Sequence, residues 1–353
     1  MGSFFILYYF YKKIFLINSQ DIFTISSQKQ FEKTALKVFR YQYENNLVYQ
    51  AFCDFLKVEK GNVKALEQIP FLPIQFFKTH EVVSNNNPIQ ETFVSSGTTS
   101  PLAPKGGNKV NSIITSKHLV TDVSLYEESY RNSFSEFYGN IEDYAVLALL
   151  PSYLEREGSS LIFMVKDLIT LSNNSNSGFY LKDYDALIKK LVALDNSGQN
   201  VLLIGVTYAL LDLIEQQRFQ LKNTIIMETG GMKGKRKEII REELHEILCK
   251  GFGVSSIHSE YGMTELLSQA YSLGHGVFEC SNWMNILIRD TEDALSYVAS
   301  GKTGGINIID LANINSCSFI ATQDLGKKYP NNSFEVLGRF DNSDIRGCNL
   351  MVI

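Results

Sequence analysis

Short apolar runs without polar alternation recur through the middle of the chain and predict buried β-strands. They cover residues 144–150, 201–206 and 224–227. Each run is followed by a polar or glycine-containing turn and then by apolar residues at helical spacing. Continuous apolar runs are typical of strands covered on both faces, and alternating strands and helices are typical of parallel sheets. The pattern predicts an α/β fold with mostly parallel sheets flanked by helices.

Apolar residues at intervals of three and four predict amphipathic helices over residues 27–58 and 236–250. Gly251 and Gly253 are expected to end the second helix. From about residue 280, short β-like runs alternate with Gly, Asn and Asp turns. This pattern predicts a smaller β-rich part over residues 280–353.

The beginning of the chain is a separate apolar segment. Residues 4–16 are apolar except where Lys12 and Lys13 interrupt them. A membrane-spanning helix needs about 20 apolar residues, and a secretory signal has its charges before the apolar stretch. We therefore predict an apolar leader over residues 1–17, flexible or mis-assigned, and a folded unit over residues 18–353 with no membrane span.

Charge and cysteine usage narrow the functional classes. A formal net charge of −5 argues against a nucleic-acid partner, because a protein that binds the phosphate backbone usually carries a basic face. The five cysteines are an odd number without a Cys-x-x-Cys pair, which predicts a reducing, cytoplasmic location rather than a disulfide framework or a zinc site. The five histidines show no metal-ligand spacing.

A loop of six small residues follows the β-type pair at residues 93–94. The loop consists of Ser95, Ser96, Gly97, Thr98, Thr99 and Ser100. Its hydroxyls and approachable backbone N–H groups are what a polyphosphate requires. The Gly-Lys-Ser/Thr of a Walker loop is missing, and an ordinary flexible turn has the same composition. Both interpretations are open from these residues alone.

Two further turns contain candidate binding residues. Gly230 and Gly231 follow a strand-like run and allow a flat group to approach the backbone, although a plain strand-to-helix turn explains them as well. The next turn comprises Tyr261, Gly262, Thr264 and Glu265. Its tyrosine can stack on a base, and its threonine and glutamate can hold a phosphate-bound Mg²⁺. The alternative is a loop with an exposed aromatic residue.

The last third of the chain adds acidic, basic and thiol groups. Asp324 can accept hydrogen bonds from both hydroxyls of a ribose. Arg339 and Arg346 can pair with phosphate or carboxylate. Cys348 closely follows the two arginines, and cationic neighbours lower a thiol pKa. Each feature alone also fits a turn, a surface cation or a buried cysteine.

The order of these motifs resembles the adenylate-forming superfamily of acyl-CoA synthetases, peptide-synthetase adenylation domains and luciferases. The resemblance assigns residues 95–100 to the phosphate loop, residues 261–265 to the aromatic-Gly-x-Thr-Glu motif and Asp324 to the ribose site. Gly338 to Asp341 resembles the hinge motif. This implies the large N-terminal-type domain of that superfamily, with its Lys-bearing C-terminal domain expected to be absent.

Within this superfamily the chain is similar to the LuxE-like acyl-protein synthetases. The resemblance implies ATP-dependent activation of a carboxylic acid, expected to be a fatty acid, to an acyl-adenylate. It also implies that Glu265 holds a Mg²⁺ ion bound to the phosphates. It further implies transfer of the acyl group to Cys348 and then to an acyl-accepting partner, a reductase or a carrier. A phenylacetate-CoA ligase-like enzyme and a non-catalytic nucleotide-binding subunit are the alternatives.

Overall fold

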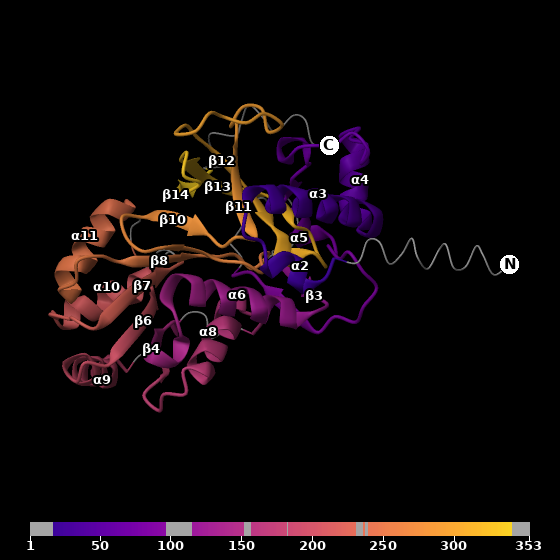
Figure 1. The fold of residues 1–353 in the computed structure, drawn as a ribbon. Coiled ribbons are helices and arrows are strands. Elements are labelled where there is room, and N and C mark those ends of the chain that lie inside the picture. The colour runs from indigo at the N-terminus through magenta and orange to yellow at the C-terminus, as the bar shows by residue number, and fades with distance from the viewer. Residues whose placement is uncertain are drawn as a thin grey trace, which may run out of the picture.

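A long sheet with helices packed along it forms the molecule (Figure 1). The computed structural model describes residues 17–96, 115–151, 157–181, 183–230, 236 and 239–340. Parallel pairing joins β4 (Tyr144–Leu149), β6 (Asn200–Val206), β7 (Thr224–Thr229) and β8 (His258–Tyr261). The short β5 (Gly178–Phe179) is parallel to β4. The three apolar runs therefore form parallel strands, as predicted.

Helices connect and cover these strands, which explains their nearly complete burial. They are α6 (Val123–Tyr138), α8 (Ser160–Leu171), α9 (Tyr184–Asn196), α10 (Thr207–Gln216) and α11 (Arg241–Phe252). Helix α11 ends at Gly253, whose φ of +70° is a left-handed conformation that favours glycine. The predicted start of α11 at residue 236 is wrong, because the helix begins at Arg241 and Arg236 instead pairs with α10.

Antiparallel strands continue the sheet beyond β8. β9 (Ala270–Ser272) and β10 (Val277–Cys280) come first. The β-type runs predicted after residue 280 form β11 (Met284–Arg289), β12 (Thr303–Asp310), β13 (Phe319–Lys328) and β14 (Phe334–Arg339). Because β10 also pairs with β14, the two groups of strands share one sheet. The division into a separate β-rich part at residue 280 stays a prediction.

The N-terminal helices pack against the β-rich end. α2 (Ser19–Phe23) precedes α3 (Gln28–Asn45) and α4 (Leu47–Phe55). The helical prediction over residues 27–58 is confirmed over most of its length, but Asn46 has an extended backbone and separates α3 from α4. Its side chain accepts a hydrogen bond from the Tyr49 N–H at 3.0 Å and donates to the Ser316 carbonyl at 2.9 Å. Capping and a tertiary contact thus outweigh the continuous apolar pattern.

Three short elements complete the frame of the site described below. They are α5 (Phe76–Thr79), the hairpin of β2 (Glu91–Val94) and β3 (Lys117–Val120), and the single turn η3 (Leu311–Asn313). The short strand β1 (Leu72–Pro73) pairs with β13. Two further 3₁₀ turns are η1 (Leu66–Gln68) and η2 (Ile141–Asp143). The hairpin carries the beginning of the predicted phosphate loop.

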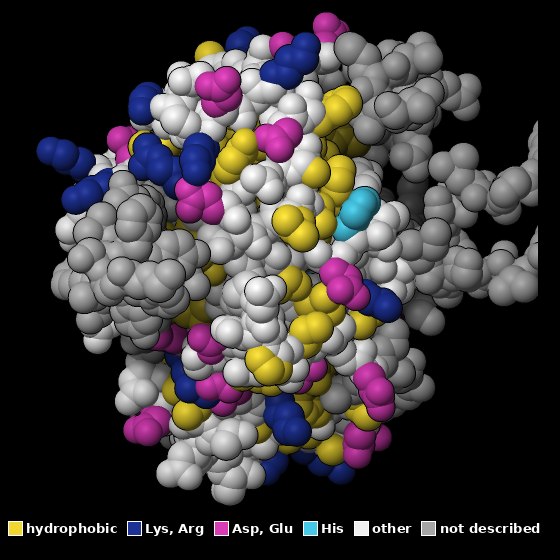
Figure 2. All heavy atoms as spheres, turned by 90° about the vertical axis from the view of Figure 1, so that its right-hand side faces the viewer, with side chains coloured by type: hydrophobic (Ala, Val, Ile, Leu, Met, Phe, Trp, Pro, Cys, Tyr) yellow, Lys and Arg dark blue, Asp and Glu magenta, His cyan; other side chains and the backbone are white. Residues whose placement is uncertain are grey.

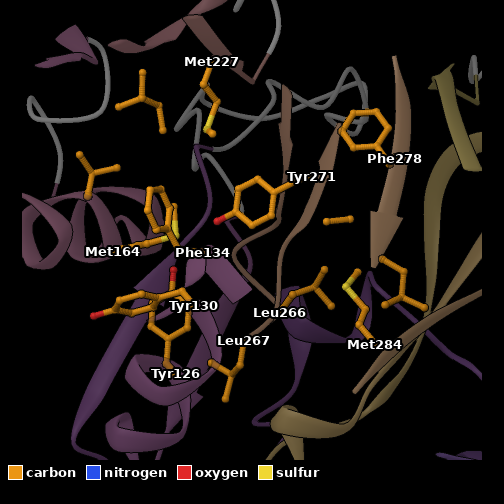
Figure 3. Packing of buried hydrophobic residues seen from close by; sticks show 14 of the residues in the cluster. Tyr126, Tyr130, Phe134, Met164, Met227, Leu266, Leu267, Tyr271, Phe278 and Met284 are labelled. Atoms are coloured by element: carbon orange, nitrogen blue, oxygen red, sulfur yellow. The ribbon is translucent and has the colours of Figure 1, made fainter. Parts of the chain in front are cut away.

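Aromatic side chains fill the interior between α6 and the sheet (Figure 3). The rings of Tyr126 and Tyr130 of α6 meet edge-on with centroids 4.9 Å apart, and Phe134 follows one turn later. On the face that includes α3 and α4, acidic, basic and apolar side chains are interspersed (Figure 2).

No membrane-spanning helix is found in the part of the chain that the structure describes.

Candidate active site

The β2–β3 hairpin delivers the start of the Ser/Thr/Gly loop to the interior. The Ser95 N–H donates to the Ser116 carbonyl at 3.0 Å, and the Ser116 N–H donates to Oγ of Ser95 at 2.9 Å. Ser96 is exposed. The remaining loop residues of the prediction, Gly97, Thr98, Thr99 and Ser100, lie outside the described residues.

Glu265 lies against this hairpin. Its side chain is only 5% exposed, and burial raises its pKa. The Ser116 side chain opposes this shift by hydrogen bonding, and the charges of Arg339 and Lys78 oppose it electrostatically. The hydroxyl-rich hairpin and the acid at position 265, which are 149 positions apart when counted from Ser116, therefore converge on one site.

Tyr261, Asp324 and Arg339 form a second cluster beside Glu265. The Tyr261 hydroxyl donates to Oδ2 of Asp324 at 2.8 Å. Asp324 and Arg339 are cross-strand partners in β13 and β14, and Nε of Arg339 lies 3.4 Å from Oδ1 of Asp324. Burial and the neighbouring Asp324 charge raise the pKa of Tyr261 well above its usual value, so its hydroxyl stays a donor. The charge of Arg339 also lowers the pKa of Glu265, so it is felt by both carboxylates.

His118 and Asn313 hold the backbone of the predicted Thr264–Glu265 motif. Nδ1 of His118 lies 2.9 Å from the Thr264 carbonyl, which can only accept, so a proton on Nδ1 makes this contact a hydrogen bond. Nδ2 of Asn313 donates to the Glu265 carbonyl at 2.8 Å, and its Oδ1 lies 3.0 Å from Nε2 of His118. Complete burial lowers the pKa of His118 to about 4, so the ring is neutral at neutral pH.

A buried carboxylate holds the other side of the same turn. Asp310 accepts from the N–H groups of Leu267 at 2.7 Å and Ser268 at 3.0 Å, and from the Ser268 hydroxyl at 2.6 Å. Sequence reasoning missed Ser116, His118, Asn313, Asp310 and Lys78. No local pattern identifies them, since each acts on a partner far away in the chain.

The two glycine turns have different structural demands. Gly230 has a φ of +75°, a region that favours glycine, whereas Gly231 lies outside the described residues. At Gly262 a Cβ atom would collide with Oε1 of Glu260. Glu260 in turn accepts from the Thr229 hydroxyl at 2.6 Å, which links the ends of β7 and β8. Both turns therefore lie at the carboxyl ends of adjacent parallel strands, where ligands bind in α/β sheets.

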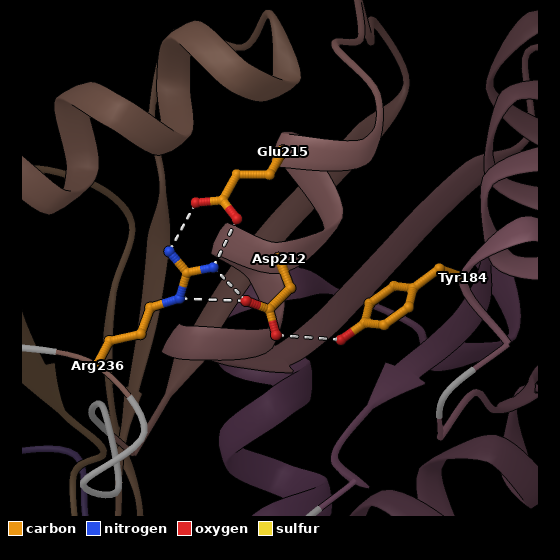
Figure 4. Close-up of polar contacts among 4 residues, drawn as sticks. All are labelled: Tyr184, Asp212, Glu215 and Arg236. Carbon is orange, nitrogen blue, oxygen red and sulfur yellow. Dashed lines mark hydrogen bonds and ion pairs between the residues drawn. The ribbon is translucent and has the colours of Figure 1, made fainter.

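Arg236 connects the segment after β7 to α10 (Figure 4). Its guanidinium donates to both oxygens of Glu215, at 2.7 and 2.8 Å, and also pairs with Asp212. Tyr184 approaches the other oxygen of Asp212 at 3.5 Å. This ion cluster ties Arg236 to α10.

The described cysteines are poor candidates for a reactive thiol. Burial raises the pKa of Cys53 and Cys280 to about 12 and also raises the pKa of Cys249 and Cys317. Within the described part of the chain, no group of three or more His, Cys, Asp and Glu side chains is placed to hold a metal ion. The predicted acyl acceptor, Cys348, lies outside the described residues.

Known proteins share both sequence and fold with this chain. A long-chain-fatty-acid–luciferin-component ligase of Vibrio harveyi is 22% identical over 349 residues, which cover 93% of this chain and 88% of that protein. The ligase of the same name from Photorhabdus luminescens is 36% identical over 72 residues, which cover 20% of this chain and 61% of that protein.

Among solved structures, 2-hydroxyisobutyryl-CoA ligase in the postadenylation state, in complex with 2-HIB-AMP, superposes with a TM-score of 0.62. The match covers 92% of this chain and 70% of that protein at 11% identity, which establishes a shared fold. The family model described as acyl-protein synthetase, LuxE, matches residues 14–132 and 152–353. The chain therefore belongs to the LuxE family of acyl-protein synthetases, as the order of its motifs predicted.

Proposed function

We propose that this acyl-protein synthetase binds ATP across the cluster of Ser116, Glu265, Arg339 and Asp324 and uses it to activate a fatty acid. The convergence of the β2–β3 hairpin and Glu265 on one site carries this proposal. The acid carboxylate attacks the α-phosphorus of ATP, the bond between the α-phosphorus and its bridging oxygen breaks, and pyrophosphate leaves. The acyl-adenylate is a mixed anhydride and therefore a good acyl donor.

Asp324 is assigned to the ribose. Its carboxylate already accepts from Tyr261, and its other oxygen faces Arg339 at 3.4 Å. The Arg339 side chain is 68% exposed, so it can leave this oxygen to ribose hydroxyls at little cost. Arg339 is then available for the phosphates, where a guanidinium opposes the negative charge that develops during transfer.

Glu265 is assigned to Mg²⁺. A single carboxylate near a polyphosphate fits Mg²⁺, which usually takes one or two carboxylates together with phosphate oxygens and water. The ion would neutralise charge on the phosphates when bound. Ser116, Lys78 and Arg339 favour the ionised carboxylate that this role needs.

The second step is assigned to Cys348. Its thiolate attacks the acyl carbonyl, the carbon–oxygen bond to phosphate breaks, and AMP leaves with the electron pair. The raised pKa values of Cys53, Cys280 and Cys249 disfavour the thiolate form in those cysteines, which supports Cys348 as the acceptor. A partner protein, a reductase or a carrier, would then receive the acyl group, and we place the enzyme in the cytoplasm.

Isotope exchange tests both steps. With a long-chain fatty acid present, the protein should exchange labelled pyrophosphate into ATP and retain acyl label that hydroxylamine removes. Cys348→Ser should keep the exchange but lose the label, whereas Cys249→Ser, the matched control, should keep both. Label retained by Cys348→Ser would reject the assigned acceptor.

Coenzyme A distinguishes the alternative ligase. If acyl-CoA forms as readily as the acyl-protein, the chain is a CoA ligase of the same fold rather than a protein acylator. Bound ATP without any pyrophosphate exchange across a panel of fatty acids would instead favour the non-catalytic nucleotide-binding subunit.

A further inference from the structure

The turn that contains Glu265 is held by two buried side chains, His118 and Asn313, that have no assigned role in the reaction. His118 lies on β3, two residues after Ser116, and is 1% exposed. Its Nδ1 lies 2.9 Å from the Thr264 carbonyl, within hydrogen-bond distance, and this contact spans 146 positions of sequence. Ser116, directly before β3, therefore contacts the Glu265 side chain, and His118 on β3 contacts the backbone of Thr264.

Asn313 completes the contact from the opposite direction. Its amide nitrogen donates to the Glu265 carbonyl at 2.8 Å and to the Cys317 carbonyl at 3.0 Å. These two acceptors fix the orientation of the amide, since reversing it would bring its oxygen against two carbonyls. Asn313 is fully buried, and its Oδ1 lies 3.0 Å from Nε2 of His118. The two side chains thus hold consecutive carbonyls, those of Thr264 and Glu265.

The surroundings of His118 explain why its ring has one orientation. Phe77 of α5 packs edge-on against it, with ring centroids 5.9 Å apart and an interplanar angle of 90°. Phe77 is itself buried and has no polar atom with which to contact the Thr264–Glu265 backbone. Packing therefore fixes the imidazole plane, and the hydrogen bond from Nδ1 fixes the peptide.

We propose that His118 and Asn313 are positioning residues for Glu265, which hold the Thr264–Glu265 backbone so that the carboxylate faces the phosphates. This inference rests on the proposed function of Glu265. Without a donor at this position, the partly buried Thr264 carbonyl would lose its partner, and the turn would rotate toward another donor. A carboxylate on a shifted turn would meet the metal-bound phosphates in the wrong geometry. Metal sites generally lose affinity or activity when the hydrogen-bond partners that orient their ligands are removed.

Asparagine and glutamine replacements at position 118 separate positioning from general stability. Asparagine places its amide nitrogen near the position of Nδ1 and can still donate to the Thr264 carbonyl. Glutamine places its amide near Nε2, away from that carbonyl. The two variants have similar polarity, and both avoid an apolar group facing buried carbonyls. The readouts are kcat for pyrophosphate exchange, KM for ATP and for the fatty acid, and the Mg²⁺ concentration for half-maximal rate.

His118→Gln should reduce kcat by about 10- to 100-fold and raise the half-maximal Mg²⁺ concentration, with KM for the fatty acid unchanged. His118→Asn should stay within about threefold of the native protein in every readout. Phe252→Leu is the control for stability, because it loosens a buried aromatic contact with Phe219 that does not involve His118, and it should lower Tm without changing the Mg²⁺ dependence. Equal activities of the Asn and Gln variants, or a Mg²⁺ dependence that Phe252→Leu changes as much, would overturn the inference.

Glu265→Gln measured in parallel separates this inference from the proposed function. If Glu265→Gln exchanges pyrophosphate at the native rate, the assignment of Glu265 is wrong and the positioning role falls with it. If Glu265→Gln is inactive but His118→Gln is not, only the positioning role is rejected.

Discussion

Nε of Arg339 lies 3.4 Å from Oδ1 of Asp324 across the β13–β14 pair, although the Arg339 side chain is 68% exposed and that of Asp324 only 10%. An ion pair with one exposed partner contributes little to stability, usually less than about 1 kcal/mol. The same arginine influences Glu265 electrostatically. Its charge therefore acts on two carboxylates while adding little to stability, which agrees with the binding role proposed above.

Replacing Arg339 tests this distinction. Arg339→Met should change the free energy of unfolding by less than about 1 kcal/mol. It should lower kcat for pyrophosphate exchange by about 100-fold, because a charged donor to the phosphates is lost. Thermal denaturation and the exchange assay measure the two effects. A large fall in Tm with little change in exchange would instead make Arg339 a structural residue.

The Tyr261 hydroxyl should behave differently, because it donates to the buried carboxylate of Asp324. Tyr261→Phe should destabilise the protein by about 1–3 kcal/mol, the usual cost of removing a hydrogen bond to a buried charged group. It should also raise KM for ATP, because Asp324 loses the donor that orients it. The same substitution in an Asp324→Asn background should cost much less, and full additivity of the two changes would contradict the contact.

Glu265→Gln should separate stability from activity. Burial raises the folded-state pKa of Glu265. The stability that this group contributes is therefore fully present below its unfolded pKa and is lost as the pH rises through its folded pKa. The neutral glutamine avoids this loss, and Tm should therefore rise at pH 7 while exchange falls by about 100-fold. The gain in Tm should shrink as the pH is lowered toward the usual glutamate range. A lower Tm at pH 7 would contradict the cause given for the shift.

The sequence predicted the central strands correctly because a strand that is buried on both faces must be apolar throughout. β6 (Asn200–Val206) and β7 (Thr224–Thr229) extend the predicted runs by only one or two residues at their ends. The helix boundaries were harder to predict from the sequence. Asn46 separates α3 from α4 through contacts with Ser316, which lies 270 positions away, and no local apolar pattern contains that information.

Family membership and the ligase class could also be predicted, because the order of short motifs is specific even where each motif is loose. The resemblance carried by that order assigns Glu265, Asp324 and Arg339 to one nucleotide site, and this assignment stays a prediction. The residues that support the site could not be predicted from the motifs. His118 was one histidine among five without metal-ligand spacing, and its role depends on Thr264 and Asn313, which only the folded chain brings to it. Residues that hold a site through backbone carbonyls leave no motif of their own.

Lys78 provides a test of the electrostatics of the site that does not remove a proposed ligand. It lies on α5, next to the Phe77 that packs against His118, and its positive charge lowers the pKa of Glu265 against the raising effect of burial. Lys78→Met should therefore raise this pKa further. If Glu265 must be ionised for pyrophosphate exchange, the acidic limb of the pH–rate profile should move to higher pH, with a smaller change at pH 8. Lys250→Met removes the same charge from α11, where Lys250 pairs with Glu246, and should leave the limb in place. An acidic limb that Lys78→Met does not move, or that Lys250→Met moves equally, would mean that Glu265 does not control the ionisation on which the exchange depends.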